Sequence, residues 1–238
     1  SLFIKEPIIA VTGTNGKTTT TTLIGELFRK AFGDVFVGGN IGTPLIQYVT
    51  ESRKAPYIVL EVSSFQLETI ETFRPNTAIL LNITEDHLDR YRNFNEYKEA
   101  KYRIFENQQG TDYALINTNI LPVMKGTPKI LPFSTRQEIS EGAFARNGNL
   151  YVRLEGHEHV YRRELSPLIG AHNTENILTA LLTAHIYGID KAITEDVLRT
   201  FKGLPHRVEY VRTVGGIAFY NDSKATNVDA AKRAIETI

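Results

Sequence analysis

The sequence predicts an α/β fold in which helices flank a mostly parallel β-sheet. Short apolar runs rich in β-branched residues alternate with segments of helical periodicity along most of the chain, which is the pattern of parallel strands joined by crossover helices. The 238 residues suffice for one large domain, or for one domain and part of another. A substantial hydrophobic core is expected at this length without disulfides or a structural metal.

Composition excludes several classes of function. Lysine and arginine number 27, as do aspartate and glutamate, so no basic field would attract nucleic acid or an anionic membrane. The chain has no cysteine, which excludes disulfides, thiolate metal sites and thiol nucleophiles. No apolar stretch approaches the roughly 20 residues that span a bilayer. We expect a cytoplasmic monomer with neither nucleic acid nor membrane as a partner.

The first half of the chain is expected to build the parallel sheet. A strand at Ile8–Val11 is followed by a glycine-rich turn and a helix with apolar residues at helical spacing, which Gly33 is placed to end. Five threonines, residues 18–22, locally favour a strand because β-branched side chains lose rotamer freedom in helices, but the preceding turn overrides them. Further strands are expected at 35–37, 57–62, 78–83, 113–116 and 129–133.

The second half mixes helices with antiparallel strands. Helices are expected at about 93–106, 173–188 and 194–201. Asn93 and Glu96 form a capping-box-like start for the first, and Asn173 is the cap candidate of the second. Turn residues flank alternating runs between 147 and 165, which predicts a small antiparallel hairpin.

A linker at Gly203-Leu204-Pro205 divides the chain. Two strands, 208–211 and 217–220, and a helix opened by NDSKATN follow it. The 35 residues after position 203 are fewer than the roughly 50 of a small independent domain. We therefore expect one domain over residues 1–203 and only the beginning of a second over 204–238.

The turn GTNGKT, Gly13–Thr18, has the features of a phosphate-binding loop. Its glycines let backbone N–H groups turn toward an anion, and the helix N-terminus adds positive potential. Lys17 would contact the β- and γ-phosphates, and Thr18 would place a hydroxyl on Mg²⁺. The usual fingerprint requires glycine at position 11, where this chain has Val11, so we expect a P-loop-type sheet with a shortened loop. The alternative is a glycine-rich turn with a chance lysine.

Two polar residues lie just after or at the end of expected buried strands. Glu61 lies near the C-terminal end of the run YIVLEV. A buried carboxylate there needs a cation or hydrogen bonds, and open α/β sheets bind ligands at such strand ends; the alternative is an edge-strand glutamate facing water. His87 follows the strand AILLNI and could bind metal or substrate, or could be a structural residue.

Lys101 interrupts an apolar helix stripe. The stripe consists of Tyr97, Ala100, Ile104 and Phe105. A lysine there usually extends its ammonium to the surface. The alternative is that the amine belongs to the active site, where it must be neutralised, paired or modified.

Seven motifs occur in order along the chain: GTNGKT, GGN at 38–40, EVSSFQLE at 61–68, NITEDHLDRY at 82–91, GAHNTEN at 170–176, GLPHR at 203–207 and NDSKATN at 221–227. Together they resemble the Mur ligases of peptidoglycan synthesis over essentially the whole chain. EVSSFQLE and NDSKATN point to the member of the family that adds D-glutamate.

The resemblance implies three domains: an N-terminal UDP-binding domain, a central ATPase domain and a C-terminal Rossmann-like domain. This chain would hold the second and the opening of the third, without the first, and should be inactive alone. The implied activity is that of an ADP-forming ligase. A carboxylate of UDP-N-acetylmuramoyl-L-alanine attacks the γ-phosphate of ATP, and the amine of D-glutamate then attacks the resulting acyl phosphate.

The resemblance also implies roles for individual residues. The ATP-binding residues would be Gly13, Thr14, Asn15, Gly16, Lys17, Thr18, Thr19, Asn176, Arg207 and Asp222. One or two Mg²⁺ ions would be bound by Thr18, Glu61, His87 and Lys101, the last as a carbamate formed with CO₂. Lys17, His87 and Lys101 would be catalytic, and the substrate contacts would be Asn40, Ser63, Gln66, Lys224 and Thr226.

Two alternatives remain open. The chain could belong to another Mur ligase or to a folylpolyglutamate synthase-type ligase, which substrate preference would distinguish. It could instead be a nucleotide-binding module that forms no amide bond. In such a module Glu61, His87 and Lys101 would have no reason to converge.

Overall fold

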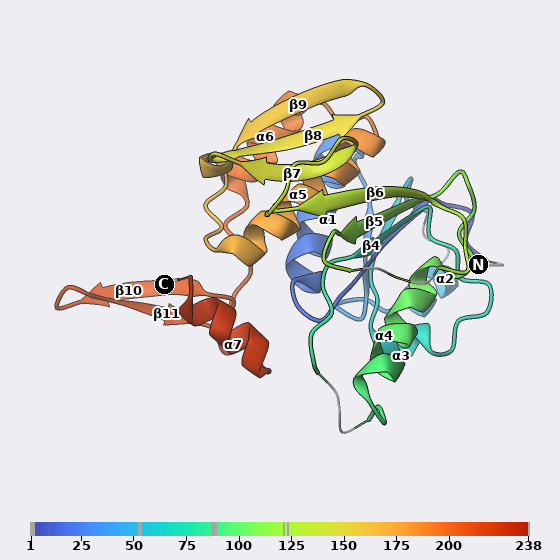
Figure 1. Ribbon diagram of the computed structural model, residues 1–238, viewed down its shortest axis with the longest axis horizontal. Helices are drawn as coiled ribbons and strands as arrows, with labels where there is room; N and C mark the ends of the chain where they lie inside the picture. The colour runs from blue at the N-terminus through green and yellow to red at the C-terminus, as the bar shows by residue number, and fades with distance from the viewer. Residues whose placement is uncertain (1–2, 52–53, 87–89, 121, 123, 238) are drawn as a thin grey trace.

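The protein is described from a computed structural model, and the described residues are 3–51, 54–86, 90–120, 122 and 124–237. Within them, nine strands form one sheet (Figure 1). In spatial order these are β2 (Phe36–Gly39), β3 (Ile58–Glu61), β1 (Ile8–Thr12), β4 (Thr77–Leu80), β5 (Tyr113–Asn117), β6 (Lys129–Ser134), β7 (Gly142–Arg146), β8 (Asn149–Leu154) and β9 (His157–Arg162). Pairing is parallel from β2 to β7 and antiparallel from β7 to β9. The predicted α/β class, its mostly parallel sheet and its small antiparallel region are confirmed.

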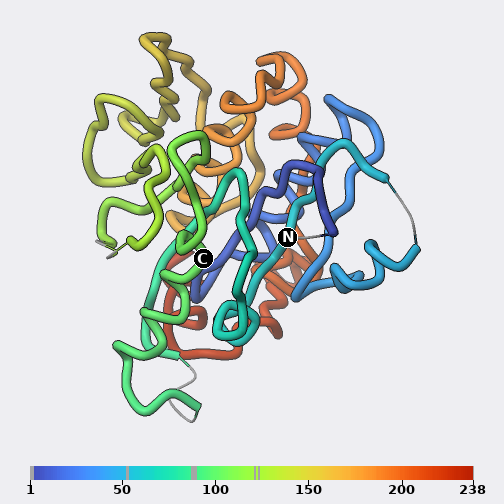
Figure 2. Tube along the Cα trace, turned by 90° about the vertical axis from the view of Figure 1, so that its right-hand side faces the viewer, coloured from blue at the N-terminus to red at the C-terminus, as the bar shows by residue number. Residues whose placement is uncertain are grey.

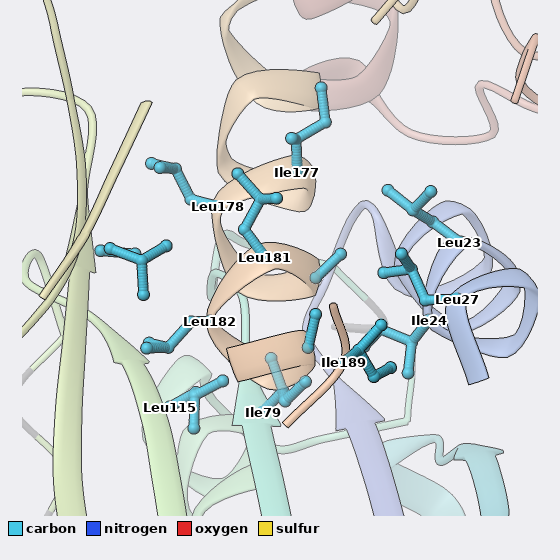
Figure 3. Close-up of a cluster of buried hydrophobic side chains, with 14 of the residues drawn as sticks. Leu23, Ile24, Leu27, Ile79, Leu115, Ile177, Leu178, Leu181, Leu182 and Ile189 are labelled. Atoms are coloured by element: carbon cyan, nitrogen blue, oxygen red, sulfur yellow. The ribbon is translucent and has the colours of Figure 1, made fainter. Parts of the chain in front are cut away.

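Helices cover both faces of the sheet. They are α1 (Lys17–Phe32), α2 (Leu45–Thr50), α3 (Ser64–Leu67), α4 (Phe94–Tyr102), α5 (Ala171–Ile186), α6 (Lys191–Thr200) and α7 (Val228–Ile235), with 3₁₀ turns at Arg103–Phe105 and Arg163–Leu165. One core lies between the sheet and the layer of α1, α5 and α6, and a second between the sheet and α4 with its 3₁₀ turn. Figure 3 shows leucines of α5 packed against those of α1 above Ile79 and Leu115. Truncating one such leucine to alanine typically costs about 2–5 kcal/mol.

The threonine run is helical, as the preceding turn predicts. Residues 18–22 form the first turns of α1, and the Thr22 hydroxyl donates to the Thr18 carbonyl at 2.8 Å. Leu23, Ile24 and Leu27 of this helix are fully buried against α5 and the sheet. Tertiary packing therefore outweighs the local strand preference.

Two predicted helix starts and one predicted capping bond are corrected. Helix α5 begins at Ala171 after Gly170, whereas Asn173 lies inside its first turn and donates to the Ile169 carbonyl at 2.7 Å. Helix α6 begins three residues before the predicted start, because the Asp190 carboxylate caps it by accepting from Ala192 N at 2.7 Å. Asn93 caps α4 as predicted, but Glu96 accepts from Arg92 N and not from Asn93 N. Strand β7 and helices α2 and α3 were not predicted.

The C-terminal residues form a separate hairpin and a helix. Strands β10 (Glu209–Val214) and β11 (Ile217–Asn221) pair antiparallel, and in Figure 1 they project away from the main sheet. Helix α7 follows and is capped by Asn227. Figure 2 shows this red segment running back beside the body of the molecule. Among the described residues, no helix has the length and apolarity needed to cross a membrane.

The imidazole of His185 should make the free energy of unfolding depend on pH. Burial, with the charges of His159 and Lys191, lowers the pKa of His185 from 6.5 to about 4. Between these values the unfolded state binds more protons, so the free energy of unfolding falls as the pH falls. Replacing His185 with Gln, which can still bond the Tyr161 hydroxyl now 2.7 Å from Nε2, should flatten this dependence in thermal unfolding. The control His157→Gln, at an exposed position of β9, should keep the wild-type slope, and equal slopes for both variants would contradict the assignment.

Candidate functional site

The loop between β1 and α1 is held in place by Asn82, at the end of the β4 segment. Thr14 N donates to the Asn82 carbonyl at 2.9 Å, and Asn15 N donates to Asn82 Oδ1 at 2.8 Å. The Asn82 amide donates back to the Asn15 carbonyl at 2.9 Å. Because these two loop N–H groups are occupied, an anion would bind to the N–H groups of residues 16–19, the first turn of α1, which have no partner within the helix.

Lys17 folds back onto this loop. Its Nζ donates to the carbonyls of Gly13 and Thr14, at 3.1 and 2.9 Å. Burial and the charge of Arg207 lower the pKa of Lys17, whereas Glu61 and Asp86 raise it. The amine thus lies within the loop, close to the helix N-terminus, where it can exchange backbone carbonyls for phosphate oxygens.

Lys101 is buried at the same loop. Only 2 % of the residue is exposed, and its Nζ donates to the Gly13 carbonyl at 2.9 Å. The alternative of a surface-reaching lysine is therefore excluded. Burial, followed by the charge of Lys17, lowers the pKa of Lys101 well below its ordinary value.

Glu61 is the last residue of β3 and is also buried, with 2 % exposure. Its Oε1 accepts from Asn40 Nδ2 at 2.9 Å, and the buried Oε2 has no hydrogen-bond partner within the described part of the chain. The alternative of a water-facing glutamate is excluded. A half-satisfied buried carboxylate is costly, and a bound cation would complete it.

The donor set fits Mg²⁺ only with further ligands. The described residues hold no group of three or more histidine, aspartate, glutamate or cysteine side chains that could bind a metal. Besides Glu61, the available ligands are the Thr18 hydroxyl, which now accepts from Arg207 Nη2 at 2.9 Å, and Lys101 once it carries a carboxylate. His87 lies outside the described residues.

Six of the ten predicted ATP contacts, all but Gly13, Thr14, Lys17 and Thr18, line a narrow cavity of about 80 Å³. Its lining includes Asn15, Gly16, Thr19, Asn176, Arg207, Asp222 and Lys224. These residues come from the loop, from α5 and from the C-terminal segment. Small-molecule sites usually measure roughly 300 Å³ or more, so a nucleotide requires the C-terminal segment to move outward.

Four of the five predicted substrate contacts do not line this cavity. Ser63 and Gln66 form the capping box of α3: Ser63 N donates to Gln66 Oε1 at 2.9 Å, and Gln66 N donates to Ser63 Oγ at 3.3 Å. Thr226 is exposed and does not line the cavity. The fourth, Asn40, has its amide committed to Glu61.

Sequence reasoning missed several residues of the site. Asn82 holds the loop in place, and its polar side chain near the end of the apolar run AILLNI was an available signal. Asp229 of α7 accepts from Asn15 Nδ2 at 2.8 Å and from the Thr84 hydroxyl at 3.3 Å. No sequence pattern links residues this far apart, and only the return of the red segment in Figure 2 brings them together.

A family model described as the Mur ligase middle domain matches residues 11–184. The chain belongs to the Mur ligase family. It is 48% identical over 239 aligned positions to a UDP-N-acetylmuramoylalanine–D-glutamate ligase of Geotalea uraniireducens, covering 99% of this chain and 53% of that protein. The chain thus spans about half the length of the curated relatives it matches.

Solved Mur ligases share the fold. MurF from Acinetobacter baumannii superimposes with a TM-score of 0.76 at 20% identity, over 99% of this chain and 54% of that one. MurF ligase from Thermotoga maritima in complex with ADP gives a TM-score of 0.71 at 20% identity, over 97% and 56%.

The bond from Asn40 to Glu61 yields a stability prediction. Replacing Asn40 with Ala should lower the free energy of unfolding by about 1–3 kcal/mol, because both oxygens of a buried carboxylate would then lack a donor. In a Glu61→Gln background, Asn40→Ala should lower the free energy of unfolding by less, because a neutral amide costs less to bury than a carboxylate. Denaturant titration would measure both, with Asn149→Ala on the exposed turn of β8 as the control. An Asn40→Ala loss no larger than that of the control would contradict the role of Asn40.

Proposed function

We propose that this chain is the ATP-binding core of an ADP-forming ligase that adds D-glutamate to UDP-N-acetylmuramoyl-L-alanine. The observation that carries the proposal is the convergence of a buried, half-paired carboxylate (Glu61) and a buried amine (Lys101) on a phosphate-type loop. The ligase of Geotalea uraniireducens named above supports the choice of substrates.

ATP would place its phosphates at the N-terminus of α1. The free N–H groups of residues 16–19 and the Lys17 amine supply positive charge there, and Arg207, now bonded to Thr18, approaches from the C-terminal segment. The ADP complex of the Thermotoga maritima enzyme supports ATP as the nucleotide. Asn176 and Asp222, which line the same cavity, are proposed to contact the adenine and the ribose.

The reaction joins two anions, so its main demand is charge neutralisation. The substrate carboxylate displaces ADP from the γ-phosphate to give an acyl phosphate, and the D-glutamate amine then displaces inorganic phosphate to form the amide. Mg²⁺, held by Thr18, Glu61, His87 and the Lys101 carbamate, would neutralise the phosphates during the first step. Lys17 would hold the transferring phosphoryl group.

Carbamylation of Lys101 is part of this proposal. The neutral amine attacks CO₂, a C–N bond forms and one proton is released, which leaves an anionic carboxylate at the end of the side chain. An ammonium cannot ligate metal, whereas this carboxylate can. The lowered pKa of Lys101 favours the neutral amine that the reaction needs.

We also propose that residues 204–238 open another domain. The hairpin exposes Tyr210, Val211, Ile217 and Phe219, and α7 exposes Val228 and Ile235. Apolar side chains gathered in this way usually pack against further chain, and the relatives are about twice as long. Lys224 and Thr226 would then serve D-glutamate at the junction. The cytoplasmic location and the monomeric state stay predictions.

Phosphate release tests the proposed activity. A version that carries both flanking domains of the relatives, given ATP, Mg²⁺ and UDP-N-acetylmuramoyl-L-alanine, should release phosphate in response to D-glutamate at least about 100-fold faster than with L-lysine or diaminopimelate. Lys101→Ala should reduce this rate by a similar factor, and a short carboxylic acid should partly restore it. Preference for another amino acid would favour another ligase of this fold, and ATP binding without any amide product would favour the nucleotide-binding module.

Gly16 gives a prediction about nucleotide binding. It has a φ of +87°, and a Cβ there would overlap Asn176 Oδ1. Gly16→Ala should therefore weaken ADP binding at least about tenfold. Backbone strain should in addition lower the free energy of unfolding by roughly 1 kcal/mol. Gly33, at the other end of α1, has a φ of +84° with nothing within 4 Å of an added Cβ. Gly33→Ala should lose stability but keep its ADP affinity by calorimetric titration; equal affinities for the two variants would contradict the role of Gly16.

A further inference from the structure

Tyr97 lies between the phosphate loop and the Lys101 amine, on which the proposed chemistry depends. It is on α4, one turn before Lys101, and only 1 % of it is exposed. Tyr91 and Phe94 pack around its ring, with centroid distances of 5.3 and 6.4 Å. The ring therefore has a fixed place in a small aromatic cluster.

The hydroxyl of Tyr97 anchors the phosphate loop. It lies 3.1 Å from Thr14 Oγ1. The single proton of the Thr14 hydroxyl goes to the Thr84 carbonyl at 3.2 Å, and Thr84 N donates to the same oxygen at 3.0 Å. With that proton on the Thr84 carbonyl, the Tyr97 hydroxyl is the donor in its bond to Thr14.

The ring face of Tyr97 holds the amine of Lys101. The Nζ lies 4.7 Å from the ring centroid while it donates to the Gly13 carbonyl. Residues four apart on a helix are about 6 Å apart along its axis. Tyr97 and Lys101 can therefore reach Thr14 and Gly13, two adjacent residues of the loop, from one face of α4.

We infer that Tyr97 is a positioning residue that fixes the Lys101 amine and the phosphate loop relative to each other. Its ring face carries negative electrostatic potential, which attracts the ammonium form of Lys101 but disfavours a carboxylate. A carbamate on Lys101 would therefore be directed away from the ring. The inference relies on the proposed function only for the nucleotide and the carbamate.

Three variants of the version with both flanking domains separate the two ends of Tyr97. Tyr97→Phe removes the hydroxyl and keeps the ring, and Tyr97→Leu removes both. Tyr102→Leu is the matched control, because Tyr102 is buried on the same helix but packs in the core with Ile104 and Phe105. Hydrogen exchange of the loop amides, ADP affinity and the ¹³C carbamate signal in labelled bicarbonate are the readouts.

Tyr97→Phe should speed exchange of the loop amides and weaken ADP binding about fivefold, as expected for one lost hydrogen bond, with the carbamate signal kept. Tyr97→Leu should weaken ADP binding at least about tenfold and lose at least about half of the carbamate signal. In a Lys101→Ala background, Phe and Leu at position 97 should bind ADP equally, because the ring then has no amine to hold.

Tyr97→Leu values equal to those of Tyr102→Leu in all three readouts would overturn the inference. The inference would also be overturned if Tyr97→Phe and Tyr97→Leu still differed in ADP affinity in the Lys101→Ala background. A wild type without a carbamate signal, or without ADP binding, would instead contradict the proposed function. Hydrogen exchange of the loop, which needs neither carbamate nor nucleotide, would still decide whether Tyr97 anchors it.

Discussion

The carbonyl oxygen of Gly13 accepts hydrogen bonds from the half-buried Lys17 and the buried Lys101, and the rest of the site follows from that constraint. Two ammonium groups that share one acceptor away from water repel each other. The pKa values of both Lys17 and Lys101 are lowered, chiefly by burial. Glu61 and Asp86 oppose this shift, and one oxygen of Glu61 has no hydrogen-bond partner among the described residues. The site is thus an arrangement of partly compensated charges that a metal-bound nucleotide would complete.

The parallel sheet is what makes this arrangement possible. β1 lies between β3 and β4, so the loop after β1, Glu61 at the end of β3 and Asn82 after β4 meet at one edge of the sheet. The carboxyl edge of parallel strands is the usual ligand site in such folds. Helix α4, which follows this edge in the chain, then brings Tyr97 and Lys101 against the same loop. Rigid strands hold the polar groups, and a helix covers them from water.

The C-terminal segment contributes a different kind of contact. Asp229, Asn227 and Arg207 reach the loop region through polar bonds to Asn15, Asp86 and Thr18. Such contacts are weak individually and leave little apolar surface buried, so they can break and re-form at low cost. Under the proposed function, this suits a segment that would withdraw to let a nucleotide enter the cavity of about 80 Å³.

The sequence by itself determined the α/β class, the glycine-containing turn between β1 and α1, the position of Glu61 near a strand end and the placement of Lys101 within an apolar stripe. Each of these depends on periodicity or spacing within a few residues, which local patterns record. Tertiary structure alone decided that Asn40 bonds Glu61, that Asn82 clamps the loop and that Tyr97 spans Thr14 and Lys101. These contacts join residues 21, 67 and 83 positions apart, for which a single chain carries no local signal. Helix starts such as Ala171 and Lys191 also differed from prediction, because the actual caps were residues outside the apolar pattern.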